Sequence, residues 1–405
     1  MFKKSEIFKT RKSTVFSVGG VTSNPQVQSV PANSNCCTSE KEMRTNPSVI
    51  PQSTNPFPKN NGIFTECCSE AATIVKDMRF TVNENFTAFG ITAPNGNPIT
   101  VDWGDTNMDN YTATGSEDVL NHTYAVPGTY TVKVYVTGAT TFKINACDGI
   151  GTDSLITVVA MPNTITNFNV GCNSLLASID TTILTNCTLF VCVLCNSLTT
   201  LDTTPLTSCT EFYCSFCTTL TTLDTTGLTS CVEFYCDSCT SLTTLDTTGL
   251  TSCTFFYINN CTSLATLDTT GLLICTSFNC NNCTSIITLN TTPLASCLNL
   301  DCGNCTSLTT IDTTPLTSCT AFWCSHCTSL VTLDTTGLTS CTDFNCSNCI
   351  LDVTNINNAL INLDSFGLLN ATADLSNQTP PAAPTGAGAT AAANLVSNGW
   401  NVTTD

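Results

Sequence analysis

Hydrophobic and polar positions repeat with a fixed period of 22 residues through the middle of the chain. Eight copies run from about residue 187 to residue 349 with the pattern C-x-x-F-x-C-x-x-C-T-S-L-T-T-L-D-T-T-G-L-T-S, without insertion or deletion. A unit of this length cannot bury its apolar face alone, so successive copies must stack on one another. The pattern therefore predicts a solenoid with one coil for each copy.

Each copy contains two short segments with strand character. In 209–217, Cys, Phe and Cys occupy the first, fourth and sixth positions, and the Thr-rich segment 220–226 begins with Leu. Thr-Gly or Thr-Pro pairs and Ser-Asn or Asn-Asn pairs separate such segments, and these pairs favour turns. We therefore predict two brief strands per coil, joined by tight turns.

The first segment resembles the L-x-x-L-x-L-x-x-N/C pattern of leucine-rich repeats, with cysteine at several leucine positions. The second segment resembles the L-T-S-L-D-V-S arm of bacterial cell-surface leucine-rich repeats. The resemblance covers about 180 residues, although the leucine content is low for that family. It implies a leucine-rich-repeat-like β-solenoid over residues 149–350.

The copies differ chiefly at the third, fifth and seventh positions of the first segment. Because side chains alternate along a strand, and Phe212 and Cys214 are expected to point into the core, these positions should face solvent. We predict a recognition surface for a glycan or a polar protein surface there. Its candidate ligand-binding residues are Glu211, Tyr213, Glu233, Tyr235, Asp237, Tyr257, Asp301 and Trp323. The alternative is that aromatic residues simply favour strands and the stripe has no ligand.

Cysteine is unusually frequent, with 29 residues, and three stand in most coils with C-x4-C-x2-C spacing. Ile258 replaces the middle cysteine of one coil, an exchange that a packed core tolerates better than a metal site or a disulfide does. We interpret these cysteines first as buried free thiols, second as disulfides, and third as ligands of zinc or an iron-sulfur cluster. Outside the coils, the doublets Cys36-Cys37 and Cys67-Cys68 are preferred as disulfide candidates over Cys147 and Cys172.

Charge is distributed unevenly along the chain. All 12 Lys and Arg residues lie at or before Lys143, and the formal net charge is −18. The acidic solenoid would be repelled by nucleic acids and by anionic membranes, which excludes both as partners. A repeated aspartate row, Asp202, Asp224, Asp246 and Asp268, could bind calcium, but a solvated acidic edge is the preferred interpretation.

Three motifs precede the coils, namely W-G-D at 103–105, H-T-Y at 122–124 and P-G-T-Y-T-V at 127–132. They resemble the W-G-D-G, H-x-Y and P-G-x-Y-x-V motifs of the PKD domain, an immunoglobulin-like β-sandwich. Thr106 replaces the last glycine of the first motif. The resemblance implies a sandwich over residues 73–148 that acts as a spacer or adhesion module, with His122 in a structural role.

The two ends differ from the repeats. Residues 1–72 are rich in Ser, Thr, Asn and Pro, which predicts an extended arm that an assembly would order. No apolar run follows its basic residues, so we expect neither a secretory signal nor a membrane span. Residues 351–405 should cap the solenoid, with helices at 351–363 and 389–397 and strands at 373–376 and 399–403. This tail resembles the ends of solenoid proteins encoded among bacteriophage structural genes and of some bacterial surface proteins.

The sequence contains no recognisable catalytic set, since it has two histidines, no G-x-S-x-G and no phosphate loop. We therefore expect a mainly β, non-enzymatic protein without cofactor. Our first hypothesis is a virion structural protein at the virion surface, attached to a capsid or tail. Its arm would contact other virion subunits, and its solenoid would contact a host surface protein or glycan; self-association is left open. The alternative is an exported bacterial-type cell-surface adhesin.

Overall fold

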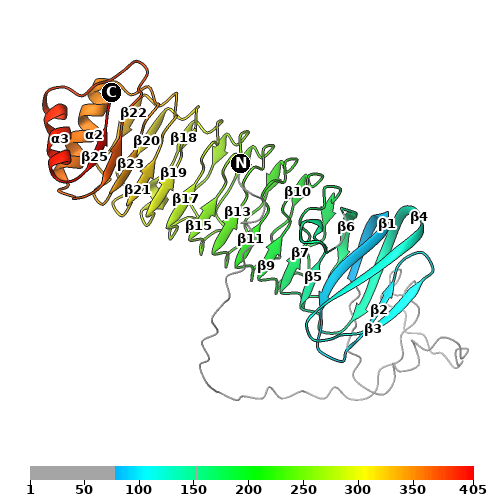
Figure 1. The fold of residues 1–405 in the computed structure, drawn as a ribbon. Coiled ribbons are helices and arrows are strands. Elements are labelled where there is room, and N and C mark those ends of the chain that lie inside the picture. Colours follow the sequence, from blue (N-terminus) through cyan, green and yellow to red (C-terminus); the bar gives the residue numbers. More distant parts are fainter. Residues whose placement is uncertain (1–77, 151–152) are drawn as a thin grey trace, which may run out of the picture. The chain divides into compact units, whose positions relative to one another are not determined.

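The computed structural model describes residues 78–150 and 153–405. The arm predicted over residues 1–72 and the two cysteine doublets lie outside the described residues. Residues from 155 onward contain the predicted repeats, and they form stacked coils (Figure 1). The 22-residue period of the sequence therefore corresponds to one coil of a β-solenoid, as predicted.

One three-residue strand from each of nine coils joins a parallel, in-register ladder. These strands are β7 (Asn167–Asn169), β9 (Leu189–Val191), β11 (Glu211–Tyr213), β13 (Glu233–Tyr235), β15 (Phe255–Tyr257), β17 (Ser277–Asn279), β19 (Asn299–Asp301), β21 (Ala321–Trp323) and β23 (Asp343–Asn345). Equivalent residues pair directly, for example Phe212 with Phe234. The register follows from the repeat, because it places every phenylalanine over the next one.

The Thr-rich segments form the second strand of each coil, with two or three residues apiece. They are β8 (Ser178–Ile179), β10 (Thr200–Leu201), β12 (Thr222–Leu223), β14 (Thr244–Leu245), β16 (Thr266–Leu267), β18 (Thr288–Leu289), β20 (Thr310–Asp312) and β22 (Thr332–Asp334). Among them β10–β12, β14–β16 and β18–β20–β22 form three separate small sheets. Between β18 and β19 the chain makes the short 3-10 helix η2 (Thr292–Leu294).

The core is a stack of phenylalanine rings surrounded by leucine and cysteine. From Phe142 to Phe278, successive rings lie with their centroids 5.2 to 5.8 Å apart and their planes roughly parallel. Leu300 interrupts the row, which resumes with Phe322 and Phe344. All of these side chains are buried, and fully buried aromatic side chains each contribute a large apolar area to stability.

The residue before the third cysteine has a left-handed backbone in every coil. With Asn173 and Gln378 counted as the equivalents at the two ends, its φ lies between 56° and 63° at Cys172, Leu194, Phe216, Ser238, Asn260, Asn282, Asn304, His326, Asn348 and Asn377. Asparagine adopts this conformation more readily than most residues because its short side chain bonds locally. His326 is therefore a turn residue, whereas bulky Phe216 fits the turn poorly.

We expect Phe216→Asn to stabilise the protein by about 0.5–1 kcal/mol, because the change relieves the cost of a left-handed bulky residue. Phe216 is 40% exposed, and the loss of its covered apolar area offsets part of this gain, which is why the expected net effect is small. Thermal unfolding followed by circular dichroism measures the effect. The reverse change Asn282→Phe should destabilise by a similar amount, and equal stability of both variants would contradict the explanation.

Antiparallel strands precede the coils: β1 (Met78–Thr92), β2 (Pro98–Asp102), β3 (Met108–Thr112), β4 (Glu117–Val136) and β5 (Thr141–Lys143). β1 pairs with β4 along most of its length, and β2 lies between β3 and β4. β5 pairs with β1 on one edge and with β7 on the other, and β6 (Leu155–Ala160) pairs with β1 and β8. Hydrogen bonds therefore continue from this region into the coils. Its layering as a PKD-type sandwich stays a prediction.

The C-terminal residues form two helices and two strands, as predicted. They are α2 (Val353–Ser365), β24 (Thr372–Asp374), α3 (Gly386–Ser397) and β25 (Asn401–Thr403). Asp352 caps α2 by accepting a hydrogen bond from the backbone N–H of Asn355, and Ile356, Leu360 and Leu363 are buried. β24 and β25 extend the main ladder beyond β23. In the described part of the chain, no helix is long and apolar enough to cross a membrane.

Candidate functional site

The tyrosines of three consecutive coils form one continuous row on the main ladder. Tyr213 pairs in register with Tyr235, and Tyr235 with Tyr257. We call these three residues the aromatic stripe. Glu211 and Glu233 lie in register beside it, on the same strands β11 and β13. The structure thus brings together five of the eight residues that the sequence analysis selected.

The three rings of the aromatic stripe stack on one another. The centroids of Tyr213 and Tyr235 are 5.1 Å apart with an angle of 24° between the planes, and those of Tyr235 and Tyr257 are 4.9 Å apart at 2°. Stacking follows from the in-register strands, whose spacing of about 4.8 Å is close to the separation of the rings. The rings therefore cover each other's inner faces, and the stripe offers mainly ring edges and hydroxyl groups.

Hydrogen bonds fix the hydroxyl groups at the two ends of the stripe. The Tyr213 hydroxyl donates to Oε2 of Glu233 at 2.7 Å, and the Tyr257 hydroxyl lies 2.8 Å from Oγ of Ser277. Burial and the nearby Glu233 carboxylate raise the pKa of Tyr235 to about 12. Burial and the hydrogen bond to Glu233 also raise the pKa of Tyr213. These two phenols are consequently neutral at physiological pH.

Two selected aspartates mainly hold neighbouring coils together. Oδ1 of Asp237 accepts hydrogen bonds of 2.8 Å from both the backbone N–H and the side-chain amide of Asn259. Burial raises the pKa of Asp237, and these hydrogen bonds offset part of that effect. Oδ1 of Asp301 similarly accepts from the backbone N–H of Gly303 at 2.9 Å and from the Asn281 amide at 3.2 Å.

Trp323 lies three coils beyond Tyr257, with Asn279 and Asp301 between them in the register. It is half-buried and does not belong to the aromatic stripe. Phe255 on β15 does adjoin the stripe, because it pairs in register with Glu233. It is 39% exposed, and the sequence analysis did not select it. The sequence did contain a signal for this residue, because Phe255 is large and apolar at an outward position where the two preceding coils have glutamate.

The seventh positions are less outward than alternation predicted. Ser215, Gly303 and Ser347 are buried at this place in their coils. The strands end two residues earlier, so the chain is already turning there and strict alternation no longer applies. The varied outer surface is therefore carried chiefly by the third and fifth positions.

The cysteines inside the coils are buried free thiols in this structure. The thiol of each third cysteine donates to a backbone carbonyl of the preceding coil, as Cys217 does to Cys192 at 3.0 Å. Asn173 and Gln378 make the equivalent contacts at the two ends of the row, to Ile144 at 2.8 Å and to Cys346 at 2.9 Å. The third position thus serves the turn backbone, as the leucine-rich-repeat pattern implied.

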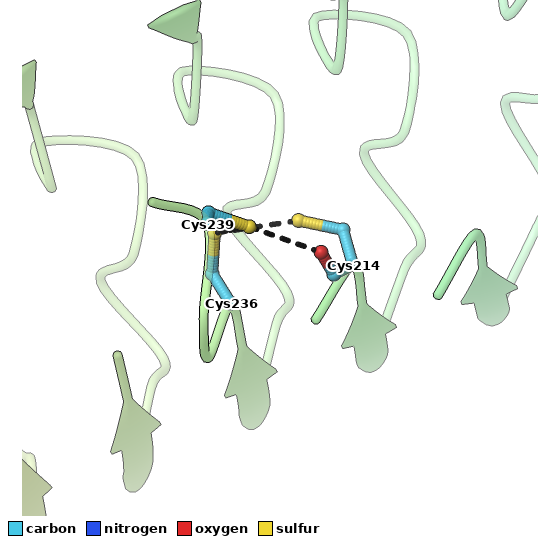
Figure 2. A group of neighbouring side chains, drawn as sticks. All are labelled: Cys214, Cys236 and Cys239. Carbon is cyan, nitrogen blue, oxygen red and sulfur yellow. Dashed lines mark hydrogen bonds between the residues drawn. The ribbon is translucent and has the colours of Figure 1, made fainter. Parts of the chain in front are cut away.

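One group of three cysteines has the proximity that a metal site requires. The Sγ atoms of Cys214, Cys236 and Cys239 all lie within 4.8 Å of one another in the core (Figure 2). The disulfide in the described residues joins Cys147 to Cys172, whose Cα atoms are 5.7 Å apart. The sequence analysis had placed this pair behind the two doublets, because spacing alone could not show that the first coil brings residues 147 and 172 together.

The aspartate row has a structural explanation without an ion. Oδ1 of Asp202 accepts a hydrogen bond from the backbone N–H of Thr204 at 2.9 Å, and Asp246 does the same with Thr248 at 2.8 Å. Asn290 makes the equivalent bond in its own coil, although it carries no charge. Asp202, Asp224 and Asp246 also line a surface depression. These residues are explained by the need for a hydrogen-bond acceptor at the start of a turn, a role that Asn fills as well as Asp does.

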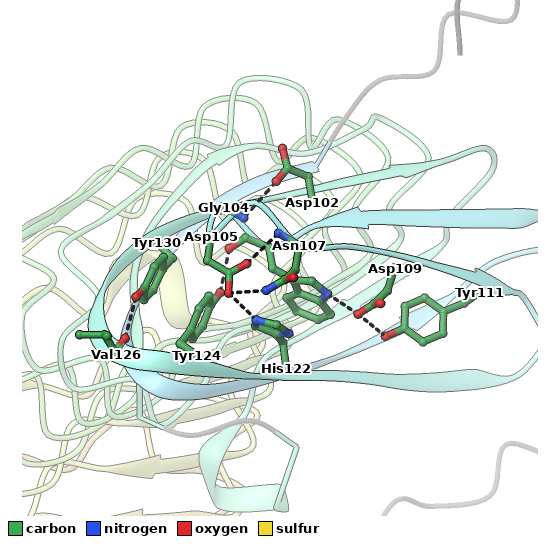
Figure 3. Close-up of polar contacts among 11 residues, drawn as sticks. Asp102, Gly104, Asp105, Asn107, Asp109, Tyr111, His122, Tyr124, Val126 and Tyr130 are labelled. Atoms are coloured by element: carbon green, nitrogen blue, oxygen red, sulfur yellow. Dashed lines mark hydrogen bonds and ion pairs between the residues drawn. The ribbon is translucent and has the colours of Figure 1, made fainter. Parts of the chain in front are cut away.

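The PKD-like motifs meet in a hydrogen-bonded network (Figure 3). The buried Trp103 donates from its indole N–H to Asp109 at 2.8 Å and stacks against His122 with a centroid distance of 5.0 Å. Nε2 of His122 lies 2.8 Å from Oδ2 of Asp105. Burial raises the pKa of Asp105, but hydrogen bonds from His122 and Asn107 outweigh it and the net shift is downward. These contacts agree with a structural role for His122.

No family model and no curated protein matches the chain. Among solved structures, it is similar to the functional domain of InlJ from Listeria monocytogenes, which is described as including a cysteine ladder. That likeness covers 60% of this chain and 70% of the other at 16% identity, with a TM-score of 0.31. An overlap of this size carries no inference about function. From its own geometry, the described chain is a cysteine-rich, mainly β solenoid with repeats of 22 residues and two C-terminal helices.

Proposed function

We propose that this protein is a non-enzymatic structural protein of a virion surface, and that its solenoid attaches to a host surface through the aromatic stripe. The observation that carries the proposal is the contrast between the two sides of the main strand. Buried positions repeat phenylalanine and cysteine from coil to coil, whereas the outward positions vary and gather Tyr213, Tyr235 and Tyr257 beside two glutamates. Rigid aromatic side chains with neighbouring polar groups are typical of recognition surfaces.

Charge and ring geometry narrow the kind of partner. Glu211 and Glu233 flank the stripe, and the chain has no Lys or Arg after Lys143. An anionic polymer would be repelled, since no cation on this face could offset its charge. Ring edges carry the positive part of the aromatic quadrupole and offer little stacking area to a sugar ring. A host protein surface that presents Lys or Arg to these carboxylates therefore fits better than a glycan does.

The virion placement is supported by features outside the stripe. The N-terminal 12 residues contain five Lys or Arg, in contrast to the acidic solenoid, which suits an arm that docks on other subunits. The PKD-like region would serve as a spacer between that arm and the coils. The alternative, an exported cell-surface adhesin, uses the same modules. Immunogold labelling of native particles and cells distinguishes the two, since only the virion proposal expects label on capsids or tails.

Simultaneous replacement of Tyr213, Tyr235 and Tyr257 by Ala should weaken attachment to host cells by about tenfold or more, because loss of even one hot-spot residue costs about 2 kcal/mol, and about 1.4 kcal/mol corresponds to a factor of ten. These side chains lie outside the phenylalanine core, so the circular dichroism spectrum should remain that of the parent. Binding of the labelled solenoid to cells, measured over a concentration series, provides the test.

The matched control replaces exposed threonines on the second strand of the same coils, Thr222, Thr244 and Thr266, by Ala. This control should attach like the parent protein. Unchanged attachment of the tyrosine variant would exclude the aromatic stripe as the recognition surface. Equal loss in both triple variants would indicate a general effect on the coils instead.

A further inference from the structure

Three thiols meet in the core immediately behind β11 and β13, at a place that the proposed attachment function does not use. The thiol of Cys236 donates to Sγ of Cys239 at 3.3 Å, and the thiol of Cys214 donates to Sγ of Cys236 at 3.4 Å (Figure 2). Cys214 and Cys236 follow directly after two tyrosines of the aromatic stripe. Asp237 and Ser238 form the turn that separates Cys236 from Cys239.

This cluster differs from the other cysteines of the solenoid. First and third cysteines donate to backbone carbonyls, as Cys231 does, and Cys239 shares this feature by donating to the carbonyl of Cys214 at 3.2 Å. Among the described residues, these are the three cysteines whose Sγ atoms all lie within 4.8 Å of one another. The row of middle cysteines is interrupted here, because Ile258 occupies the equivalent place in the next coil, and it resumes at Cys280. Cys236 is thus held between two sulfur atoms on one side and an apolar side chain on the other.

The surroundings favour a neutral product over a bound metal. Metal binding would require three thiolates together in the core, whereas disulfide formation passes through one, and the chain has no Lys or Arg beyond Lys143 to balance several such charges. Sulfur atoms around a tetrahedral zinc, at 2.3 Å from the metal, lie about 3.8 Å apart. The contacts here are shorter, at 3.3 and 3.4 Å. A disulfide carries no charge and needs no fourth ligand.

The backbone also permits a bond within the turn. Residues 236–239 form a turn. A β-turn brings its first and fourth Cα atoms within about 7 Å, which overlaps the usual Cα separation of about 4.4–6.8 Å in disulfides. Cys236 and Cys239 stand at these two places, and their sulfur atoms are already in contact.

We infer that Cys236 and Cys239 form a disulfide in preference to every other cysteine pair of the coils when the folded protein meets hydrogen peroxide. The Cys239 thiolate attacks one peroxide oxygen, the O–O bond breaks, and a sulfenic acid and hydroxide result. Sγ of Cys236 then displaces the sulfenic oxygen, and its proton leaves with that oxygen as water. Two thiols and one peroxide therefore give one disulfide and two waters.

The electrostatics agree with Cys239 as the attacking group. Hydrogen bonds with neighbouring thiols lower the pKa of Cys239, as they do for Cys217 and Cys261, although burial opposes the shift. The hydrogen bond with Cys261 and burial instead raise the pKa of Cys283, the equivalent of Cys239 two coils later. The closed loop would contain Asp237, whose carboxylate holds the next coil beside the aromatic stripe.

Cleavage before aspartate provides the test, since trypsin has no site in the coils. In the full chain treated with limiting peroxide and then alkylated, peptides 224–236 and 237–245 should be found linked, with a loss of two free thiols per chain. Fragmentation of the linked pair should find Cys231 alkylated and Cys236 in the bond. Cys236→Val should abolish the linked pair and leave a sulfenic acid on Cys239 that dimedone traps. Ile258 shows that an apolar side chain fits this place. The matched variant Cys280→Val should leave the linked pair unchanged.

Three results would overturn the inference. Linkage of peptides 202–223 and 224–236, with fragmentation placing the bond on Cys214 and Cys236, would assign the bond to that pair instead. Equal oxidation of Cys280 and Cys283, which have the same spacing, would show that the sulfur contacts give no preference. Zinc or copper bound stoichiometrically in the parent protein and lost in Cys236→Val would identify a metal centre. Because the parent protein is itself mapped, the result does not depend on whether a variant folds.

Discussion

Replacing Phe234 by Ala is expected to lower the free energy of unfolding by about 3–5 kcal/mol. The Phe234 ring is fully buried and stacks between Phe212 and Phe256, with centroid distances of 5.5 and 5.3 Å. Its removal loses the apolar burial of the ring and leaves a cavity. The neighbouring coils cannot close this cavity readily, because β13 is hydrogen bonded on both edges to β11 and β15.

Phe234→Leu is the matched control, since Leu300 occupies the same register position in another coil and is fully buried. It should cost clearly less than the alanine variant, because the isobutyl group fills most of the space. Urea unfolding followed by circular dichroism gives both values. If Phe234→Ala lowered the free energy of unfolding by less than about 1 kcal/mol, the coils would have closed the cavity by repacking, and the ring stack would contribute little to stability.

Gly271→Ala is expected to cost about 1–3 kcal/mol or more, because the added methyl group has no space. A Cβ at this position would overlap the carbonyl oxygen of Thr247 in the preceding coil. Backbone atoms cannot rotate away as a side-chain tip can, so the two coils would have to separate. The hydrogen bond of 3.2 Å from the backbone N–H of Gly271 to Oγ1 of Thr247 would be strained by the same movement.

Gly128→Ala serves as its control, because the atom nearest to the added Cβ is the Tyr130 hydroxyl at 3.4 Å, an ordinary contact. We expect this variant to remain within about 0.5 kcal/mol of the parent. Thermal unfolding of both variants checks the comparison. If Gly271→Ala were as stable as Gly128→Ala, the close approach of the coils at Thr247 could not be a fixed feature of the solenoid.

The interior of the coils could be predicted closely from the sequence. Phe212 and Cys214 are buried where the alternation placed them, and both strands of the coil appear at the predicted segments. The C-terminal helices and strands also occupy the predicted stretches. These features depend on local patterns, since the side-chain period within a segment decides which face is buried.

The candidate site could be predicted only in part. The row of Tyr213, Tyr235 and Tyr257 follows from the repeat, but the stacking that covers the ring faces depends on the side-chain rotamers across three coils. The inward turn of Ser215 and the coil-bridging role of Asp237 were not visible in strand alternation. Both result from where the strand ends, which spacing locates less accurately than it locates the strand itself.

By itself, the sequence determined that this protein is a β-solenoid with 22 residues per coil, a core of Phe, Leu and Cys, and a C-terminal cap. Every copy contains the same local signals, so each coil adopts the same backbone conformation. The stacking of equivalent coils then sets the strand register. Only the tertiary structure decided which polar and sulfur atoms meet, as in the disulfide of Cys147 with Cys172 and the contact of Cys236 with Cys239. Such contacts depend on distances of a few tenths of an ångström between coils or across a turn, and no residue pattern encodes them directly.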